Sequence, residues 1–365
     1  MLSTKAQLRL TKNFANLLKY SNSSAANRPT ELFFSDQGYR QTNSGIRATI
    51  FGATGFVGPY VGAVLGYIGS DLNFPHCHQY NYDDAVKELK LCAVSGQSYL
   101  MKHFDFDNEE MLDRAIENSN VVINLCGPRK QVKKLGDAEY VNIDISRKIA
   151  KACAKNPNVI RLIHFSAAGA EPDSASIDLS TKYFGEQEVK QHFPNATILR
   201  PTTIYGMNDY FVRLWYTERD YFYHYNVVTD DCTAKRQPIL VNDVAQAVLN
   251  ALKLPETAGK TYDLGGPHTY SRLEIFETLH NIIGRPPKLA YVPFSFASTV
   301  AKNFHNWENF NLDTMVKNQL DLVCNPNNGN INDLYIQPVS FPNGVEQFIH
   351  DIKAKYEKSR DLNER

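Results

Sequence analysis

Three glycines spaced three residues apart follow a short apolar run, near the N-terminal end of the region expected to fold. The run at 48–51 predicts a strand, and residues 60–67 predict the start of a helix. In a strand–turn–helix unit, Gly52 permits a tight turn, Gly55 lets the backbone approach a pyrophosphate, and Gly58 lets the helix pack closely on the strand. The helix N-terminus then points free N–H groups and its positive dipole end at the phosphates. This segment therefore predicts a dinucleotide site.

A membrane-spanning helix is the main alternative for this segment. Residues 48–70 contain no charge, and Gly58, Gly62 and Gly66 mimic the small-residue face of a packed membrane helix. Against this, six glycines and one proline fall within 50–69, and such residues weaken a helix. No other stretch approaches spanning length. We therefore expect no transmembrane segment in the chain.

Composition excludes several classes of function. The 365 residues suffice for about two domains. They carry 39 Lys and Arg against 39 Asp and Glu, and no basic stripe indicates nucleic acid. The six cysteines form no Cys-x-x-Cys pair, so we expect no zinc site, no disulfide framework and a reducing compartment. His76, Cys77 and His78 are consecutive, but neighbouring residues of an extended chain point in different directions, so we expect no metal there.

The first thirty residues differ from the rest of the chain. They contain no acidic residue before Glu31, and leucines and a Ser/Asn-rich stretch are interleaved with basic side chains. The basic residues are Lys5, Arg9, Lys12, Lys19 and Arg28. This composition is typical of a mitochondrial presequence. A flexible basic tail is the alternative.

Strand and helix patterns alternate after the glycine turn. Expected strands are 48–51, 71–75, 99–104, 120–127, 159–165 and 197–200, and expected helices are 60–67, 108–117, 139–154 and 178–191. We interpret the polar stretch 76–90 as an insertion or long loop. The order predicts an α/β fold with a doubly wound parallel sheet and a smaller C-terminal lobe.

The expected domains are a dinucleotide-binding domain at 45–200 and a C-terminal lobe at 201–365 that partly completes the sheet. Within the lobe we expect strands at 237–241 and 260–264, helices at 242–252, 271–283 and 343–357, and a loop at 325–330. In such sheets ligands lie beyond the carboxyl ends of the strands.

Six motifs in this order resemble the extended or atypical short-chain dehydrogenase/reductase superfamily, over residues 45–264. They are GATGFVG (52–58), NLCG (124–127), VNID (141–144), HFSA (164–167), LRPTTIYG (199–206) and ILVNDVA (239–245). The resemblance implies a Rossmann fold that binds NAD(H) or NADP(H), with the nicotinamide near Ser166, Lys182 and Pro201. The nucleotide-binding residues expected are Gly52, Thr54, Gly55, Phe56, Val57, Gly58, His76, His78, Asp105, Phe106, Leu125, Cys126, Gly127, Asn142, Ser166, Lys182, Pro201 and Thr202.

The catalytic pair of that superfamily is broken in this chain. Its members use a Tyr four residues before a Lys, so that both lie on one helix face and the Lys lowers the Tyr pKa. Lys182 matches the Lys, but the Tyr position is Asp178, and Tyr183 lies about 100° around the helix from Lys182. An ionised carboxylate pairs with Lys182 but cannot donate a proton as a phenol does. With Ser166 also retained, we expect a degenerate site without dehydrogenase activity.

Cofactor choice depends on the residues after the second strand. An acidic residue there favours NAD(H) by accepting from the ribose 2′-OH, and residues 76–78 contain none. The sequence therefore predicts NADPH. No Arg is present to bind the 2′-phosphate, so His76 or His78, or Lys87 or Lys90, must serve instead.

A more specific resemblance is to the Rossmann-fold accessory subunit family of mitochondrial respiratory complex I. It rests on NVVINLCG (120–127), on FGE-xx-V (184–189) followed by FPNA (193–196), and on the presequence-like N-terminus. The resemblance implies tightly held NADPH, a structural or regulatory role, and docking on other complex I subunits of the peripheral arm near its junction with the membrane arm. It implies a location on the matrix side of the mitochondrial inner membrane. An active NADP(H)-dependent reductase or epimerase using Tyr205 or Tyr183, and a dinucleotide redox sensor, are the alternatives.

Overall fold

The computed structural model describes most of the chain from Ser44 to Ile352. The described residues are 31–32, 43–77, 83–94, 96–128, 135–209, 211–213, 215, 226–228, 232–284, 289–303, 312–352 and 354. The expected presequence at 1–30 and His78 lie outside them.

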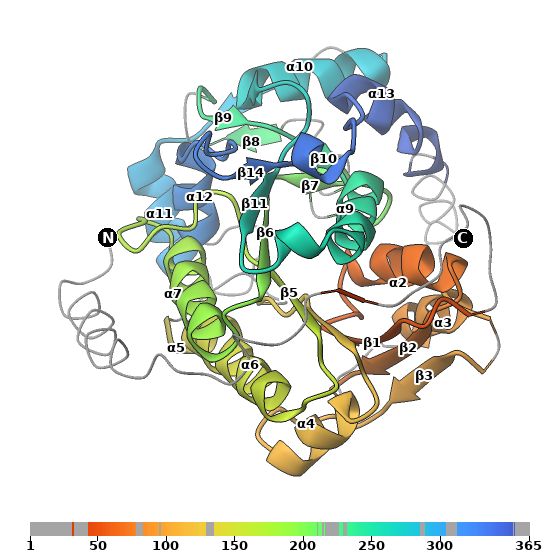
Figure 1. Ribbon diagram of the computed structural model, residues 1–365. Coiled ribbons are helices and arrows are strands. Elements are labelled where there is room, and N and C mark those ends of the chain that lie inside the picture. Colours follow the sequence, from red (N-terminus) through yellow and green to blue (C-terminus); the bar gives the residue numbers. More distant parts are fainter. Residues whose placement is uncertain are drawn as a thin grey trace.

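One eight-stranded parallel sheet organises the molecule (Figure 1), in the order β14-β11-β6-β5-β4-β1-β2-β3. Its strands are β1 (Arg47–Phe51), β2 (Asp71–Pro75), β3 (Ser98–Met101), β4 (Val121–Asn124), β5 (Arg161–Phe165), β6 (Thr197–Pro201), β11 (Thr261–Leu264) and β14 (Gly329–Asn330). Every residue of β4 and β5 is buried, as expected for strands covered on both faces. Among the strands of this sheet, β11 and β14 come last in the sequence, and they extend the sheet beyond β6.

Helices cover both faces of the sheet. Ile50 of β1 packs with α2 (Gly58–Tyr67) and α9 (Val241–Lys253) in one core. Phe51, the next residue, faces the other core, with α4 (Glu109–Ile116), α6 (Ile145–Lys155) and α7 (Ile177–His192). This two-sided packing confirms the expected doubly wound α/β fold.

Smaller elements build the C-terminal lobe around a third core that contains Tyr205, Leu240, Ile275, Phe341 and Phe348. Its strands are β7 (Ile204–Tyr205), β8 (Asn226–Val228), β9 (Lys235–Arg236), β10 (Ile239–Leu240), β12 (Tyr270–Ser271) and β13 (Leu289–Tyr291). Its helices are η3 (Pro255–Thr257), α10 (Arg272–Ile282), α11 (Phe294–Asn303), α12 (Leu312–Gln319), η4 (Ile331–Leu334) and α13 (Phe341–Glu346).

Three local expectations are wrong. The stretch 76–90 is not all loop, because it holds most of α3 (Asp83–Leu91), and two parallel strands need such a crossover. The helix expected at 139–154 is interrupted, since a π-turn, η2 (Tyr140–Asp144), separates α5 (Leu135–Glu139) from α6. The loop expected at 325–330 ends in β14, which pairs with β11.

The uncharged stretch 48–70 divides into β1, the glycine turn and α2. Across the described ranges, no helix has both the length and the apolar character needed to cross a membrane.

Candidate functional site

The glycine turn between β1 and α2 has the geometry that its sequence predicts. Gly52 has a φ of +75°, and a Cβ on it would lie 2.8 Å from the carbonyl carbon of Leu125. A Cβ on Gly58 would lie 1.9 Å from the carbonyl oxygen of Ala53, so α2 packs against the turn at a distance that only glycine permits. Both positions therefore require glycine for the fold itself.

Gly55 differs from its two neighbours in the motif. A Cβ on it would meet only the carbonyl oxygen of Gly52, at 3.3 Å, and otherwise open space. The helix that follows starts at Gly58 with no capping side chain and no acidic residue in its first turn. A helix N-terminus with no side-chain cap, beside the open space at Gly55, suits a pyrophosphate. These residues fit a dinucleotide.

The expected binding residues converge on the carboxyl edge of the sheet. In a parallel sheet the carboxyl ends of all strands share one edge, and each of these segments follows such an end. They are the turn Gly52–Gly58 after β1, His76 after β2, Asp105 and Phe106 after β3, Leu125–Gly127 after β4, Ser166 after β5, and Pro201 and Thr202 at β6. Thr54, Phe56 and Val57 belong to the same turn.

Aromatic side chains line the edge between β1 and β3. The rings of Phe104 and Phe106 lie 4.9 Å apart at 85°, and Phe51 lies 5.7 and 5.8 Å from them. Phe51 and Phe104 are buried, whereas Phe106 is half-buried beside the exposed Asp105. Burial raises the pKa of the nearby Cys126 thiol far above its usual range, so it is not a thiolate.

The residues proposed to meet a 2′-phosphate are not well placed for it. Burial, and then the charges of Lys102 and His103, lower the pKa of His76, so its ring is neutral at physiological pH. Ser98 begins β3 and its hydroxyl donates to the carbonyl of Leu89 at 3.1 Å. Lys87 and Lys90 lie in the second half of α3, beside Leu89 and so toward the start of β3.

A buried polar network lies where β4 and β5 end. Asn124 donates to the hydroxyl of Ser146 at 3.2 Å, and its amide lies 3.1 Å from Nδ1 of His164. Burial lowers the pKa of His164 to about 3, with the charges of Lys182 and Lys190 adding to the shift. The imidazole is neutral, and Nδ1 accepts from the amide. The sequence motifs NLCG and HFSA contain Asn124 and His164, but their pairing was not predicted.

Ser166 is an orphaned buried polar group. Its side chain is 3% exposed, and its Oγ has no hydrogen-bond partner within the described part of the chain. Buried hydroxyls are normally paired, and a ligand atom at this edge would supply the missing partner. Thr202, by contrast, is satisfied, since its Oγ1 donates to the carbonyl of Gln237 at 2.5 Å.

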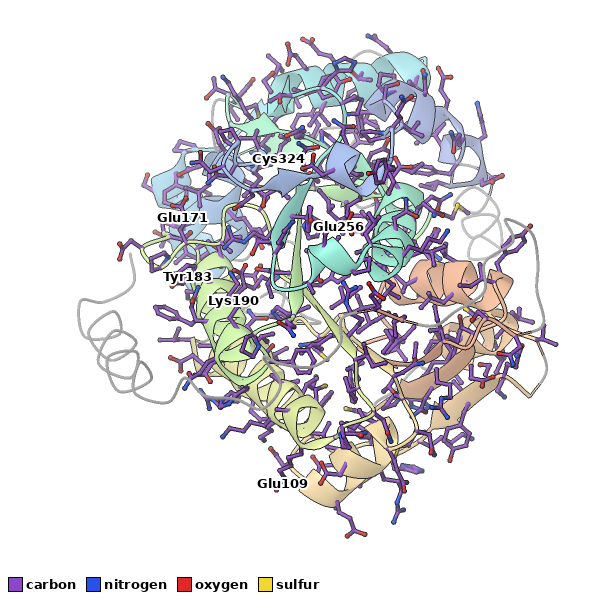
Figure 2. All side chains as sticks on the ribbon, in the orientation of Figure 1. Glu109, Glu171, Tyr183, Lys190, Glu256 and Cys324 are labelled. Carbon is purple, nitrogen blue, oxygen red and sulfur yellow. The ribbon has the colours of Figure 1, made fainter. Side chains whose placement is uncertain are left out.

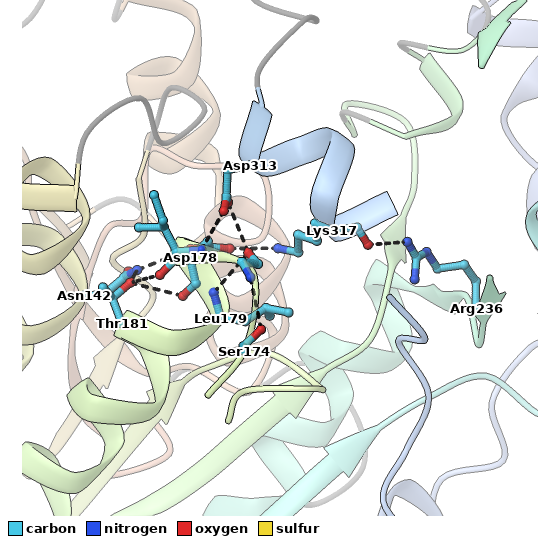
Figure 3. Close-up of polar contacts among 10 residues, drawn as sticks. Asn142, Ser174, Asp178, Leu179, Thr181, Arg236, Asp313 and Lys317 are labelled. Carbon is cyan, nitrogen blue, oxygen red and sulfur yellow. Dashed lines mark hydrogen bonds and ion pairs between the residues drawn. The ribbon is translucent and has the colours of Figure 1, made fainter. Parts of the chain in front are cut away.

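Asp178 is held by the C-terminal lobe (Figure 3). Nζ of Lys317 in α12 lies 2.7 Å from its Oδ2, and Nδ2 of Asn142 donates to its Oδ1 at 3.3 Å. Asp178 thus forms a close ion pair with Lys317, in addition to its expected electrostatic interaction with Lys182. Burial by itself would raise the Asp178 pKa, but the charges of Lys182 and Lys317 outweigh it and hold the pKa well below its usual range.

The same helix caps the start of α7. Asp313 of α12 accepts from the N–H of Ile177 at 2.6 Å and from the hydroxyl of Ser176 at 3.1 Å. Arg236 secures the other end of α12 by donating to the carbonyls of Lys317, at 2.8 Å, and Leu320. We call this set of contacts the α12 clamp: Ser176, Ile177 and Asp178 of the α7 start, Asp313 and Lys317 of α12, and Arg236.

Lys182 faces the same region from one turn further along α7. Burial lowers its pKa, while the charge of Asp178 acts in the opposite direction. Tyr183, the next residue along α7 (Figure 2), contacts Ile143 and the ring of Phe184, 5.6 Å away. The structure therefore places no phenol at the position that the Tyr-x-x-x-Lys pair would give it.

The π-turn places Asn142 beside α7. A Cβ on Gly185 would lie 2.1 Å from the Asn142 carbonyl oxygen, so the two elements touch backbone to backbone. Nδ2 of Asn142 also donates to the hydroxyl of Thr181 at 2.9 Å. π-turns frequently occur at functional sites, and this one aims a polar side chain at Asp178.

Comparison with known proteins agrees with this geometry. The model of the NAD dependent epimerase/dehydratase family matches residues 48–265. The solved structure of UDP-glucuronic acid 4-epimerase from Bacillus cereus superposes with a TM-score of 0.65, covering 85% of this chain and 100% of that one at 18% identity. This likeness shows the fold alone.

Two curated relatives are more similar in sequence. NADH dehydrogenase (ubiquinone) 1 alpha subcomplex subunit 9, mitochondrial, of Mus musculus is 35% identical over 71% of this chain and 66% of its own length. The NADH-ubiquinone oxidoreductase 40 kDa subunit, mitochondrial, of Neurospora crassa is 30% identical over 87% of this chain and 83% of its own length. The chain therefore belongs to the NAD dependent epimerase/dehydratase family and, within it, to the accessory subunits of mitochondrial complex I that these relatives represent.

Proposed function

We propose that this chain is a non-catalytic accessory subunit of mitochondrial complex I that holds NADPH as a structural ligand. It acts on the matrix side of the inner membrane, where it supports assembly and stability of the peripheral arm near its junction with the membrane arm. The subunit family and its mitochondrial location come from the relatives. What we propose beyond this is that the bound nucleotide is NADPH, that it serves as a structural ligand, and that the subunit docks near the junction of the two arms.

The single observation that carries the proposal is the state of Asp178. General acid catalysis requires a group that releases a proton in the working pH range. The Asp178 carboxylate is ionised, because its pKa lies well below the usual range. Lys317 occupies its Oδ2 and Asn142 its Oδ1. A group held in this way stabilises the contact between α7 and α12 and has no proton to give.

Features that bind a nucleotide are nevertheless retained. Gly55 leaves open space beside the start of α2, and the buried Ser166 hydroxyl lacks a partner in the described residues. NADPH, when bound, would supply a hydride donor, but this chain would contribute only binding and orientation. Gly52–Gly58 would hold the pyrophosphate, Lys182 the ribose beside the nicotinamide, and Ser166 a polar atom at that end.

A bound nucleotide can stabilise the folded protein without taking part in any reaction. A ligand that binds only the folded state stabilises it by RT ln(1 + [L]/Kd), about 2.7 kcal/mol at a hundredfold excess over Kd. The residues assigned to it come from strands across the centre of the sheet and from α7, which the α12 clamp joins to the C-terminal lobe. Occupancy of the site therefore supports the surfaces that the subunit presents to its partners.

The reductase or epimerase alternative lacks a suitable acid. Tyr205 is fully buried in the core of the C-terminal lobe, where desolvation raises its pKa far above the usual range. Its ring packs on Phe341 and its hydroxyl lies against Ser340. Tyr183 packs on Phe184. Neither phenol replaces the missing one.

Separation of solubilised mitochondrial membranes on a native gel tests the assignment. Mass spectrometry should find the chain in the complex I band, because a subunit co-migrates with its assembly. Heat denaturation of the purified protein should release NADPH. Recovery of the chain only as a small soluble species would contradict the subunit role. Oxidation of the bound nucleotide by a carbonyl compound, abolished in Lys182→Ala without loss of binding, would establish the enzyme alternative.

A further inference from the structure

Lys102 and His103 are two exposed basic residues at the carboxyl end of β3. The N–H of His76 donates to the carbonyl of Met101 at 3.0 Å, and the N–H of Phe104 donates to the carbonyl of His76 at 3.0 Å. These two backbone hydrogen bonds fix the residues on either side of the pair. Lys102 and His103 lie between Met101 and Phe104, directly after the end of β3 and next to the end of β2. Both side chains are exposed.

The backbone of these two residues is unusual. His103 has a φ of 54°, in the left-handed region that favours glycine. Histidine, asparagine and aspartate enter this region more readily than other side chains, but it remains an uncommon conformation. Such outliers cluster at functional sites because the surrounding structure holds them in place. Here His76 and Phe104 do so, and the imidazole of His103 is presented at one defined point of the edge.

The position matches one part of a dinucleotide. The strand order places β2 next to β1, and β3 next to β2. In this kind of sheet the pyrophosphate lies at the turn after the first strand, and the adenosine ribose lies by the end of the second. His76 stands at that end, but its ring is half-buried and burial lowers its pKa. Lys87 and Lys90 lie in the second half of α3, beside Leu89, whose carbonyl accepts from the hydroxyl of Ser98 at the start of β3. Lys102 and His103 lie beside His76 on the correct edge.

We propose that Lys102 and His103 bind the 2′-phosphate of NADPH and give this chain its preference for NADPH over NADH. The inference rests on the proposed function, namely nucleotide binding at the glycine turn. The Lys102 ammonium can form charge-assisted hydrogen bonds with phosphate oxygens, and an imidazole N–H of His103 can donate to them as well. The carboxylates that follow are already engaged, since Asp105 accepts from the N–H of Asp107 at 2.9 Å and Asp107 pairs with Lys148.

Calorimetric titration of the purified full-length chain with NADPH and with NADH tests the proposal. The double variant Lys102→Gln, His103→Asn removes the Lys102 charge and the His103 imidazole, and Asn tolerates the left-handed backbone of position 103. Its affinity for NADPH should fall about tenfold or more, while its affinity for NADH stays the same. Lys260→Gln, which neutralises an exposed cation directly before the start of β11, at the amino edge of the sheet, is the matched control and should leave both affinities unchanged.

Three results would overturn the inference, and they are distinguishable. Unchanged binding of NADPH by the double variant would show that other groups bind the 2′-phosphate. Equal losses for NADPH and NADH would show an effect on the pocket as a whole, and the melting temperature without nucleotide reports whether the fold is intact. Binding of neither nucleotide by the unsubstituted chain would overturn the proposed function and this inference with it.

Discussion

Lys317 and Asp178 stand 139 residues apart in sequence, and their charged atoms lie 2.7 Å apart in the structure. The pair joins α12 of the C-terminal lobe to the first turn of α7. The predictions below test its consequences.

Removal of Lys317 should destabilise the protein more than removal of an exposed lysine. In Lys317→Met the buried carboxylate of Asp178, 13% exposed, loses its ion-pair partner, at an expected cost of about 1–3 kcal/mol in the free energy of unfolding. The control is Lys148→Met, because Asp107, its partner, is 62% exposed and such pairs contribute at most about 1 kcal/mol. Urea titration of both variants measures the difference. Equal losses would contradict a structural role for the α12 clamp.

Gly55 and Gly58 should fail in different ways when replaced by alanine. Gly58→Ala forces a Cβ to within 1.9 Å of the Ala53 carbonyl oxygen, so it should lower the melting temperature whether or not nucleotide is present. Gly55→Ala meets only the Gly52 carbonyl oxygen, at 3.3 Å, so it should fold nearly normally and lose the stabilisation by NADPH. Thermal denaturation with and without NADPH separates the two effects. Gly136→Ala, in open space, is the control, and an intact NADPH response in Gly55→Ala would count against the pyrophosphate assignment.

His164 should make stability fall in mild acid. Its pKa is about 3 in the folded protein and about 6.5 when unfolded. Because the folded pKa is the lower one, the unfolded state takes up the proton first. The stabilisation is therefore complete above about pH 6.5 and is lost as the pH falls from there toward 3, by up to about 1.4 kcal/mol per pH unit.

The variant His164→Gln keeps an acceptor near Asn124 and removes this titration. Urea denaturation of both proteins between pH 7.5 and 5, with those values chosen to bracket the ordinary histidine pKa of about 6.5, should give a smaller slope for the variant. Parallel stability curves would show that the imidazole does not titrate as its burial requires.

The first thirty residues should direct import into mitochondria. Their five basic residues precede the first acidic one, Glu31, and the membrane potential draws such segments inward. A fusion of residues 1–30 to a cytosolic reporter should move the reporter to the matrix. A variant with Lys5, Arg9 and Lys12 changed to Gln should not be imported, and a reporter that stays cytosolic with the natural segment would contradict the prediction.

Local patterns predicted the nucleotide-binding half of the molecule. The glycine turn and the order of strands β1 to β6 depend on residues close together in sequence, where period and spacing are informative. The α12 clamp was not predictable in this way, because Asp313 and Lys317 contact α7 only after the C-terminal lobe has packed. The charge of Asp178 interacts with that of Lys182, as expected, but its close ion pair with Lys317 was not predicted. A spacing of four residues identifies neighbouring side chains on one helix. It carries no information about a side chain, such as Lys317, that reaches the same carboxylate from another helix.

The two-residue strand β14 has a consequence for biogenesis. Its pairing with β11, and the contacts of Asn325 and Asn328 with Asp263, mean that the sheet begun at Arg47 is finished by Gly329 and Asn330. A chain made or translocated from its N-terminus leaves the edge of β11 open until almost its whole length has emerged. Unpaired strand edges recruit other chains, so the arrival of β14 closes an edge that would otherwise stay open to them.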